Sequence, residues 1–130
     1  MPPTIRWNAE VLLEEGGLSV FVNRWGILAR AKQPYVDWVN SMDDDGLTMD
    51  LESQRMQPTI FLINEREGMT LDEIVREFFW EAIFDMELVA WMRDTSVWPA
   101  NRTVEMFYEW FEVELVADLI ELGRGRIKSQ

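Results

Sequence analysis

Carboxylates are the only side chains in this sequence that are numerous and clustered enough to suggest chemistry. The chain of 130 residues holds 24 Asp and Glu against 12 Lys and Arg, and it has no His and no Cys. Nucleophilic catalysis of the Ser-His-Asp or Cys-His kind needs an imidazole base or a thiol, and zinc sites are built largely from the same groups. The composition therefore excludes these classes of site. It leaves carboxylate chemistry with hard cations such as Mg²⁺ or Ca²⁺.

Residues 41–52 come closest to a metal-binding pattern. Compared with the twelve-residue calcium loop, they place Asp43 and Asp45 at positions 3 and 5. Gly46 and Glu52 fall at positions 6 and 12, but position 1 is serine and position 8 is threonine. We therefore interpret the segment as an acidic loop. Asp43, Asp45 and Glu52 are the candidate ligands if the protein is a carboxylate-based, metal-dependent enzyme, and otherwise no cofactor is expected.

A row of glutamates is the second acidic feature. Glu105, Glu109 and Glu112 follow one another at spacings of four and three, which places them on one face of an α-helix. Like charges at these spacings repel by about 0.2–0.5 kcal/mol per pair, so the row does not serve helix stability. It is either a solvated face or an imitation of a phosphate backbone that occupies the basic groove of a nucleic-acid-binding protein. In the second case the protein would be a phage-type inhibitor of a host nuclease or defence complex.

Two apolar stripes accompany these acids, one on each of two expected C-terminal helices. The earlier helix carries Trp80, Phe84, Leu88 and Trp91, and the later helix carries Met106, Trp110, Val113, Ala117 and Ile120. Each stripe lies opposite a core-facing stripe, and a helix that is apolar on two faces is normally buried on two. The stripes therefore either pack within the monomer or form a surface that binds a protein partner or a second copy of the chain. The candidate binding residues are Trp80, Phe84, Trp91, Met106, Trp110 and Val113, with the acids Glu105, Glu109 and Glu112.

The two helices that must position these residues have clear start signals. Residues 70–73 form a capping box, and Asn101 or Thr103 caps the second helix, which is expected to reach Gly123. Asp118 interrupts the core stripe of the second helix, and we expect it to form a salt bridge or to reach the helix edge, because an unpaired buried carboxylate is costly. The core stripe of the first helix is Leu71, Ile74, Val75, Phe78, Ala82, Met86 and Val89. The core stripe of the second is Val104, Phe107, Tyr108, Phe111, Leu115, Leu119 and Leu122.

The first half of the chain supplies the sheet. Leu18–Ala31 is typical of one long strand or of two strands around Gly26, and the apolar run 58–63 is typical of a strand buried on both faces. A short helix is expected over Gln33–Val39, where Pro34 suits the first turn. The expected fold class is α/β (α+β), in one small domain with a short sheet of two to four strands, two long C-terminal helices and one short helix.

This domain is expected to span residues 18–123. Residues 1–17 are expected to form an N-terminal arm or an extra strand, and residues 124–130 a short basic tail. No secretory signal is apparent, and the longest run without a charge, residues 56–64, is far shorter than the roughly 20 apolar residues of a membrane helix. We expect no membrane partner, and a cytoplasmic location is the default for a chain without cysteines for disulfides.

The negative charge is concentrated in the second half of the chain. The net charge is −12, and residues 64–123 hold 15 acids against four bases. Binding to phosphates depends largely on Lys and Arg, so free nucleic acid is not an expected partner.

From Asn23 onward, blocks of the sequence match a pattern that can be recognised. They are Asn23-Arg24, Lys32 to Trp38, Ile60 to Ile63, Ile83 to Leu88 with Trp91, and Trp98 to Thr103 running into Met106 to Glu114. On these residues the chain resembles a small family of uncharacterised acidic bacterial proteins, over about residues 23–122. The resemblance implies a compact acidic α/β protein and implies no activity.

These patterns lead to three functional hypotheses. The first is a non-enzymatic, cytoplasmic module that binds a protein partner, or itself as a homodimer, through acidic helices rich in tryptophan. The alternative is the nucleic-acid mimic, whose partner would be a basic nucleic-acid-binding protein. The third is the carboxylate-based metal enzyme.

Overall fold

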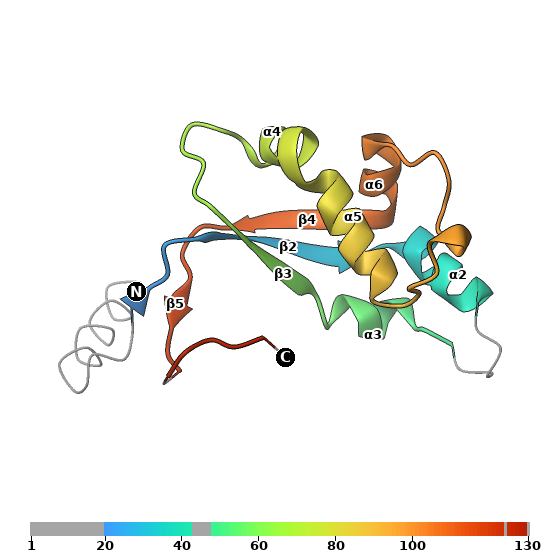
Figure 1. Cartoon of the computed structure of the whole chain (residues 1–130), viewed down its shortest axis with the longest axis horizontal. Helices are drawn as coiled ribbons and strands as arrows, with labels where there is room; N and C mark the ends of the chain where they lie inside the picture. The colour runs from blue at the N-terminus through green and yellow to red at the C-terminus, as the bar shows by residue number, and fades with distance from the viewer. Residues whose placement is uncertain (1–19, 43–47, 124, 130) are drawn as a thin grey trace.

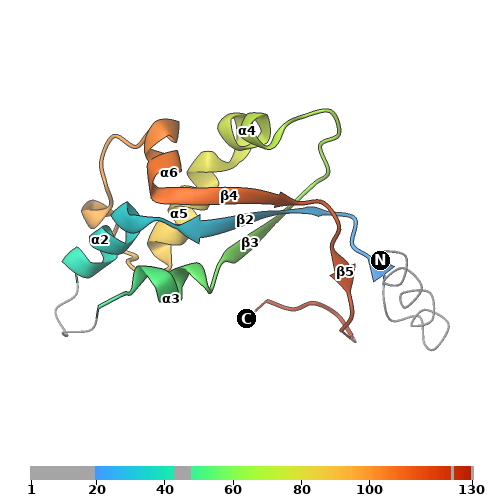
Figure 2. The same cartoon turned by 180° about the vertical axis from the view of Figure 1, so that it is seen from behind.

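The fold is built on a three-stranded antiparallel sheet with helices packed against one face (Figures 1 and 2). The computed structural model describes residues 20–42, 48–123 and 125–129. In spatial order, the strands of the sheet are β3 (Thr59–Ile63), β2 (Trp25–Ala31) and β4 (Phe111–Val116). The protein is thus a small single domain of mixed α and β structure, which confirms the predicted fold class.

The central strand β2 shows which face of the sheet is the core face. Its residues Ile27, Ala29 and Ala31 are buried, and they alternate with Leu28 and Arg30, which are partly exposed. The same alternation continues across the sheet, because antiparallel pairing places Phe111 opposite Ala31 and Phe61 opposite Ile27. One face therefore carries the core, and the other meets solvent.

The strand predicted for residues 58–63 exists, but it is not buried on both faces. β3 is an edge strand, and only Ile63 of its five residues is buried. Ile60 and Leu62 point away from the helices and stay exposed. The prediction failed because a continuous apolar run is also compatible with a strand whose second face is left open.

The strand predicted for residues 18–31 is divided, but not at Gly26. β1 (Val20–Phe21) leaves the sheet and pairs with β5 (Ile120–Glu121) in a separate ribbon, and β2 begins at Trp25. Gly26 lies inside β2, where a Cβ atom would come within 2.5 Å of the Ile60 side chain. Its role is therefore to allow this close approach across the sheet.

Two short helices follow the first two strands of the chain. α2 (Gln33–Ser41) has Pro34 in its first turn and buries Tyr35, Val36 and Val39, which confirms the predicted short helix. α3 (Leu51–Arg55) is capped by Asp50, whose side chain accepts a hydrogen bond from the backbone N–H of Ser53.

The long helical segment over residues 71–89 begins at the predicted capping box. The Thr70 hydroxyl accepts from the Glu73 N–H at 3.1 Å, and the Glu73 carboxylate accepts from the Thr70 N–H at 2.8 Å. The segment has three parts, namely α4 (Leu71–Ile74), a π-helical turn (Val75–Phe79) and α5 (Trp80–Val89). In the π turn the Trp80 N–H bonds to the Val75 carbonyl, five residues back, so the turn holds one residue more than an α-helical turn.

The prediction of a second long helix up to Gly123 was wrong. After the 3₁₀ turn Thr95–Val97, α6 (Val104–Trp110) is only two turns long, and the chain continues as β4 and β5 instead of reaching Gly123 as a helix. Residues 111–116 read Phe-Glu-Val-Glu-Leu-Val, which alternates apolar and acidic side chains with the period of a strand. Six residues of this segment pair with the edge of β2 that β3 leaves open. Because of this pairing, the segment forms a strand and does not continue the helix. Asp118 consequently lies exposed between β4 and β5 and does not interrupt a buried stripe.

The core between sheet and helices is rich in aromatic side chains. Tyr35, Phe84, Phe107 and Phe111 are fully buried or nearly so, and Trp110 lies among them. Within the described residues, none of the helices is both long and apolar enough to cross a membrane.

Candidate partner-binding surface

The outward face of the segment 71–89 carries an exposed apolar row, which we call the outer row. It consists of Phe78, Ala82, Met86 and Val89. The side chains of Phe78 and Met86 are 48% and 57% exposed, although the helical pattern of the sequence predicts them in the core. That prediction was wrong because the extra residue of the π turn rotates everything after it by about 100°, the angle that one residue subtends in an α-helix. The residues one position further along, Phe79 and Ile83, face the core instead.

Acidic side chains flank the outer row. Glu77 and Glu81 are exposed beside Phe78 and Ala82, and neither takes part in an ion pair within the described residues. One cation lies close to the row, since the Arg66 guanidinium sits 4.0 Å above the ring of Phe78. The surface thus combines exposed apolar side chains with negative charge.

The apolar stripe predicted on the opposite side of the same helix is mostly core. Phe84 and Leu88 are fully buried, Trp80 is half-buried, and only Trp91 is exposed, at 50%. The ring of Phe84 lies 5.4 Å from that of Trp110, measured between ring centroids. Phe84 and Trp110 are therefore not accessible to a partner, in agreement with the alternative that the stripe packs within the monomer.

The stripe predicted on the later helix does not exist as a stripe. Met106 and Trp110 lie on α6, whereas Val113 lies on β4 and faces the sheet's core side. Met106 and Val113 are half-buried and Trp110 is buried against Tyr35 and Phe84. These three residues stabilise the fold and form no exposed seam.

The predicted glutamate row is also divided between two elements. Glu105 and Glu109 lie on α6, but Glu112 lies on the outward face of β4 and pairs with Arg55. The hydrogen bond and charge of Arg55 lower the pKa of the Glu112 carboxyl. Glu105 reaches the Arg76 guanidinium at 3.5 Å, so cations compensate two of the three acids. A continuous phosphate-like row is therefore absent from these residues.

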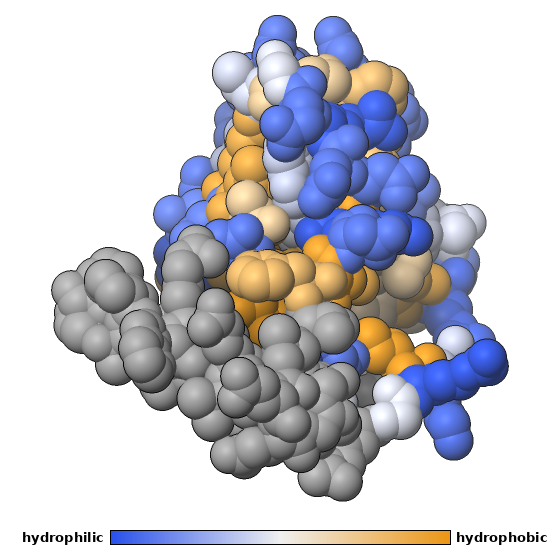
Figure 3. Space-filling view, turned by 90° about the vertical axis from the view of Figure 1, so that its left-hand side faces the viewer, coloured by the Kyte–Doolittle hydropathy of each residue, from blue (hydrophilic) through white to orange (hydrophobic). Residues whose placement is uncertain are grey.

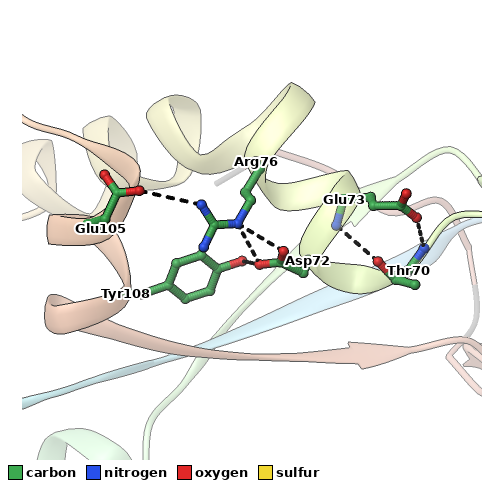
Figure 4. A network of polar contacts seen from close by, with 6 residues as sticks. All are labelled: Thr70, Asp72, Glu73, Arg76, Glu105 and Tyr108. Atoms are coloured by element: carbon green, nitrogen blue, oxygen red, sulfur yellow. Dashed lines mark hydrogen bonds and ion pairs between the residues drawn. The ribbon is translucent and has the colours of Figure 1, made fainter.

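A polar network ties α4 and the π turn to α6 (Figure 4). The Tyr108 hydroxyl donates to Asp72 Oδ1 at 2.8 Å, and Arg76 Nε donates to both oxygens of Asp72 at 2.9 Å. The Tyr108 and Arg76 bonds lower the pKa of Asp72, while burial and the Asp72 bond raise the pKa of Tyr108 to about 12. Tyr108 is therefore protonated at neutral pH and donates its hydroxyl proton to the Asp72 carboxylate, so the network links α6 to the start of the segment 71–89.

The Trp98 to Thr103 segment packs back onto α5. The Arg102 guanidinium lies 4.9 Å from the ring of Phe84 and 5.6 Å from that of Trp98, and it pairs with Asp85 at 2.8 Å. The Trp98 indole N–H donates to the Met92 carbonyl at 2.8 Å, and the Thr103 hydroxyl caps α6. The ion pair of Arg102 with Asp85 thus ties this segment to α5.

The metal candidates of the acidic loop are not brought together in the described part of the chain. Asp43 and Asp45 lie outside the described residues, and Glu52 lies in the first turn of α3. No group of three or more Asp or Glu side chains among the described residues is arranged to hold a metal ion.

A second apolar surface lies at the end of the molecule that Figure 3 shows. The exposed apolar side chains in and next to the ribbon and β3 are Phe21, Ile60, Leu62, Ile120 and Leu122. These residues lie on the ribbon and on the open face of β3. Residues 1–19 directly precede the ribbon and lie outside the described part of the chain, so we infer no occupant for this surface.

Glu87 is a notable residue that the sequence patterns did not single out. It is the one charged residue that is buried among those described, at 9% exposure, and burial raises the pKa of its carboxyl. Its own backbone carbonyl accepts a 2.7 Å hydrogen bond from the buried Tyr35 hydroxyl. Glu87 follows Ile83, a core residue, at a spacing of four, which places both on the same helix face. The sequence could have predicted the burial of Glu87 only if the rotation at the π turn had been known.

Replacing Glu87 by glutamine is expected to raise the free energy of unfolding at pH 7, because burial disfavours the charged carboxylate in the folded state and raises its pKa. Because its pKa is higher in the folded state than in the unfolded state, Glu87 favours folding only when protonated, and this contribution is lost as the pH rises through the folded pKa. The gain from E87Q should therefore shrink towards pH 4. Urea denaturation at pH 4, 5.5 and 7 measures it, with the exposed E81Q as control. A gain of equal size at pH 4 and pH 7 would contradict the assignment.

The geometry is the only guide to function for this chain. Comparisons with models of known protein families, with curated proteins and with solved structures found no match.

Proposed function

We propose that this protein is a non-enzymatic interaction module that binds a basic protein partner through the outer row. The observation that carries the proposal is the exposure of Phe78 and Met86 on a helix whose other face is firmly packed in the core. Large apolar side chains exposed in a row are typical of interaction surfaces, and methionine adapts readily to a partner's shape. The rigid underside would keep the row in one geometry and so lower the entropy cost of binding.

The charge around the row indicates the kind of partner. Glu77 and Glu81 are exposed beside it, and the chain as a whole has a net charge of −12. Complementary charge accelerates association, so a basic surface with an apolar centre is the best match. A second copy of this chain would place acid against acid at the same row, which disfavours a homodimer through this face. Free nucleic acid is disfavoured for the same electrostatic reason.

Several other charged groups form ion pairs or hydrogen bonds with one another, which favours binding rather than catalysis. Asp72, Arg76 and Tyr108 form one closed network, and Asp85 pairs with Arg102. On the open face of the sheet, Arg30 pairs with Glu114 at 2.9 Å and Arg55 pairs with Glu112. These contacts hold structural elements together and leave Glu77 and Glu81 for a partner.

The double substitution of Phe78 and Met86 by serine is expected to reduce partner capture at least tenfold, equivalent to about 1.4 kcal/mol of binding free energy. Tagged wild-type protein and the double variant are compared in quantitative pull-downs from cells that express the chain naturally. The Met56→Ser variant is the matched control, because Met56 is also exposed but lies just after α3, away from the row. Capture should also weaken with salt, since acids on the exposed rim steer the partner.

Specific results would contradict the proposal. A partner retained equally by the wild type and the double variant would exclude the outer row, as would one lost equally from the Met56→Ser protein. Far-UV circular dichroism confirms that the double variant is folded, which is expected because both side chains are substantially exposed. Light scattering during size-exclusion chromatography tests for self-association, and a dimer that dissociates only in the double variant would identify a second copy as the occupant instead.

A further inference from the structure

A pocket lies between α2, α3 and the end of α5, separate from the outer row. Its volume is about 410 Å³, which falls within the range of roughly 300–1,000 Å³ typical of ligand-binding pockets. Its walls are mainly apolar and include Val39, Met42, Met49, Trp91 and Met92. Trp91 lines the pocket and is half exposed.

The apolar walls are held in place by hydrogen bonds behind them. The Asn40 side chain accepts from the Met49 N–H at 2.6 Å and donates to the Met49 carbonyl at 3.1 Å. The Met92 N–H bonds to the Leu88 carbonyl, and its own carbonyl accepts from the Trp98 indole. The Met42 N–H also bonds to the Val39 carbonyl, so all three methionines have hydrogen-bonded backbones, while their flexible side chains can adapt to a ligand.

Among the described residues that line the pocket, one is charged, and it is an acid. Asp50 Oδ2 accepts from the Ser53 N–H at 2.9 Å and from the Ser53 hydroxyl at 3.0 Å. Asp50 Oδ1 makes no hydrogen bond within the described residues. The lining residues that the structure describes include no Lys or Arg, and the Gln54 and Gln57 side chains supply further polar atoms. The pocket is therefore apolar in its walls and negative at one place.

We propose that this pocket binds the side chain of a lysine presented by a peptide. Its aliphatic stem would lie against the methionines and Val39, and its ammonium group would contact the Asp50 carboxylate and the face of the Trp91 indole. An anion would meet no positive group among the described lining residues, and a wholly apolar ligand would offer no hydrogen bond to Asp50 Oδ1. The net charge of −12 increases the local concentration of cations. The proposal rests on different side chains from the outer row, so it does not depend on the proposed function.

The test uses protein labelled with ¹³C in the methionine methyl groups and observed by NMR. Met42, Met49 and Met92 report on the pocket, while Met86 and Met106 lie outside it and serve as internal controls. Resonances are assigned by single Met→Leu substitutions. The probes are Nα-acetyl-lysine N-methylamide, its norleucine analogue, which has the same stem without the charge, and 1,5-diaminopentane. We expect the lysine probe to shift the three pocket resonances and to bind at least tenfold more tightly than the norleucine probe.

Two variants test the chemistry of recognition. Asp50→Asn keeps an N-cap acceptor for α3 but removes the charge, so it should weaken lysine binding at least tenfold without changing norleucine binding. Trp91→Leu should also weaken lysine binding, because it removes the aromatic face. Equal shifts by lysine and norleucine, or an unchanged lysine affinity in Asp50→Asn, would overturn the proposal. Shifts by 1,5-diaminopentane alone would overturn the peptide source and identify a free alkylammonium ligand.

Discussion

Phe84→Ala is expected to lower the free energy of unfolding by about 3–5 kcal/mol, which is the usual cost of truncating a fully buried phenylalanine. The ring has no exposed surface and lies within 6 Å of the rings of Phe107, Trp110 and Phe111, measured between centroids. The Arg102 guanidinium also packs on the Phe84 ring, at 4.9 Å from the ring centroid. No neighbour can fill the cavity without breaking these aromatic contacts. A small domain is stable by only about 5–15 kcal/mol, so the loss should be a large fraction of the total.

Phe78→Ala is the matched control, since it makes the same chemical change six residues earlier on the same helical segment. Phe78 is 48% exposed, and its main contacts are Arg66 and Phe79. An exposed cation–π contact is worth about 0.5–1 kcal/mol, so this variant should lose no more than about 1 kcal/mol. Urea denaturation followed by far-UV circular dichroism measures both variants. Equal losses, or a larger loss for Phe78, would mean that the core face of the helix had been assigned wrongly.

The contrast between Phe84 and Phe78 shows which features of this fold sequence patterns can predict and which they cannot. The capping box, the helix it begins and the short helix at Pro34 follow from local chemistry that needs no tertiary information, and the structure confirms them. The choice of core face does not follow in this way, because both faces of residues 71–89 are apolar. A π turn leaves no mark in the sequence that hydrophobic periodicity can detect. One extra residue in this turn was enough to turn the predicted core positions that follow it, Ala82, Met86 and Val89, towards solvent.

The C-terminal segment illustrates a different ambiguity. Phe111, Val113 and Leu115 alternate with Glu112 and Glu114, which satisfies the period of a strand. The same residues also fit helical stripes when they are joined to α6, and the segment contains no Gly or Pro to mark a boundary. What decides the matter is the need of β2 for a partner along its second edge, which is a non-local requirement.

The residues predicted for the candidate site are not the residues of the outer row. The sequence pattern places Phe78 and Met86 in the core, yet both are exposed beside Glu77 and Glu81. The rotation at the π turn accounts for the exposure of Met86. The pocket of Asp50 and Trp91 was not predicted, since its walls combine residues between 39 and 57 with Trp91 and Met92, which are distant from them in the sequence.

Deleting Glu77 is expected to change the free energy of unfolding by no more than about 1 kcal/mol, because it should convert the π turn into an ordinary α-helical turn. The core positions before the turn are Leu71, Ile74 and Val75, and those after it are Phe79, Trp80, Ile83, Phe84, Glu87 and Leu88. Each set follows the spacings of three and four that an α-helix requires, but one residue too many separates the two sets. Removing one exposed residue inside the turn would bring both sets into a single helical phase without moving a core side chain from its place.

Deleting Met86 is the matched control for this prediction. Met86 is also exposed and also lies in the segment 71–89, but it follows the π turn, so its removal rotates Glu87 and Leu88 away from the core. The loss of the buried Leu88 side chain alone costs about 2–5 kcal/mol, and the hydrogen bond from the Tyr35 hydroxyl to the Glu87 carbonyl would be displaced as well. Urea denaturation should therefore show a loss of more than about 3 kcal/mol for this deletion, against almost none for Glu77. If the two deletions were equally harmful, the π turn could not be a one-residue insertion in an otherwise regular helix, and the outward orientation of Phe78 and Met86 would need another cause.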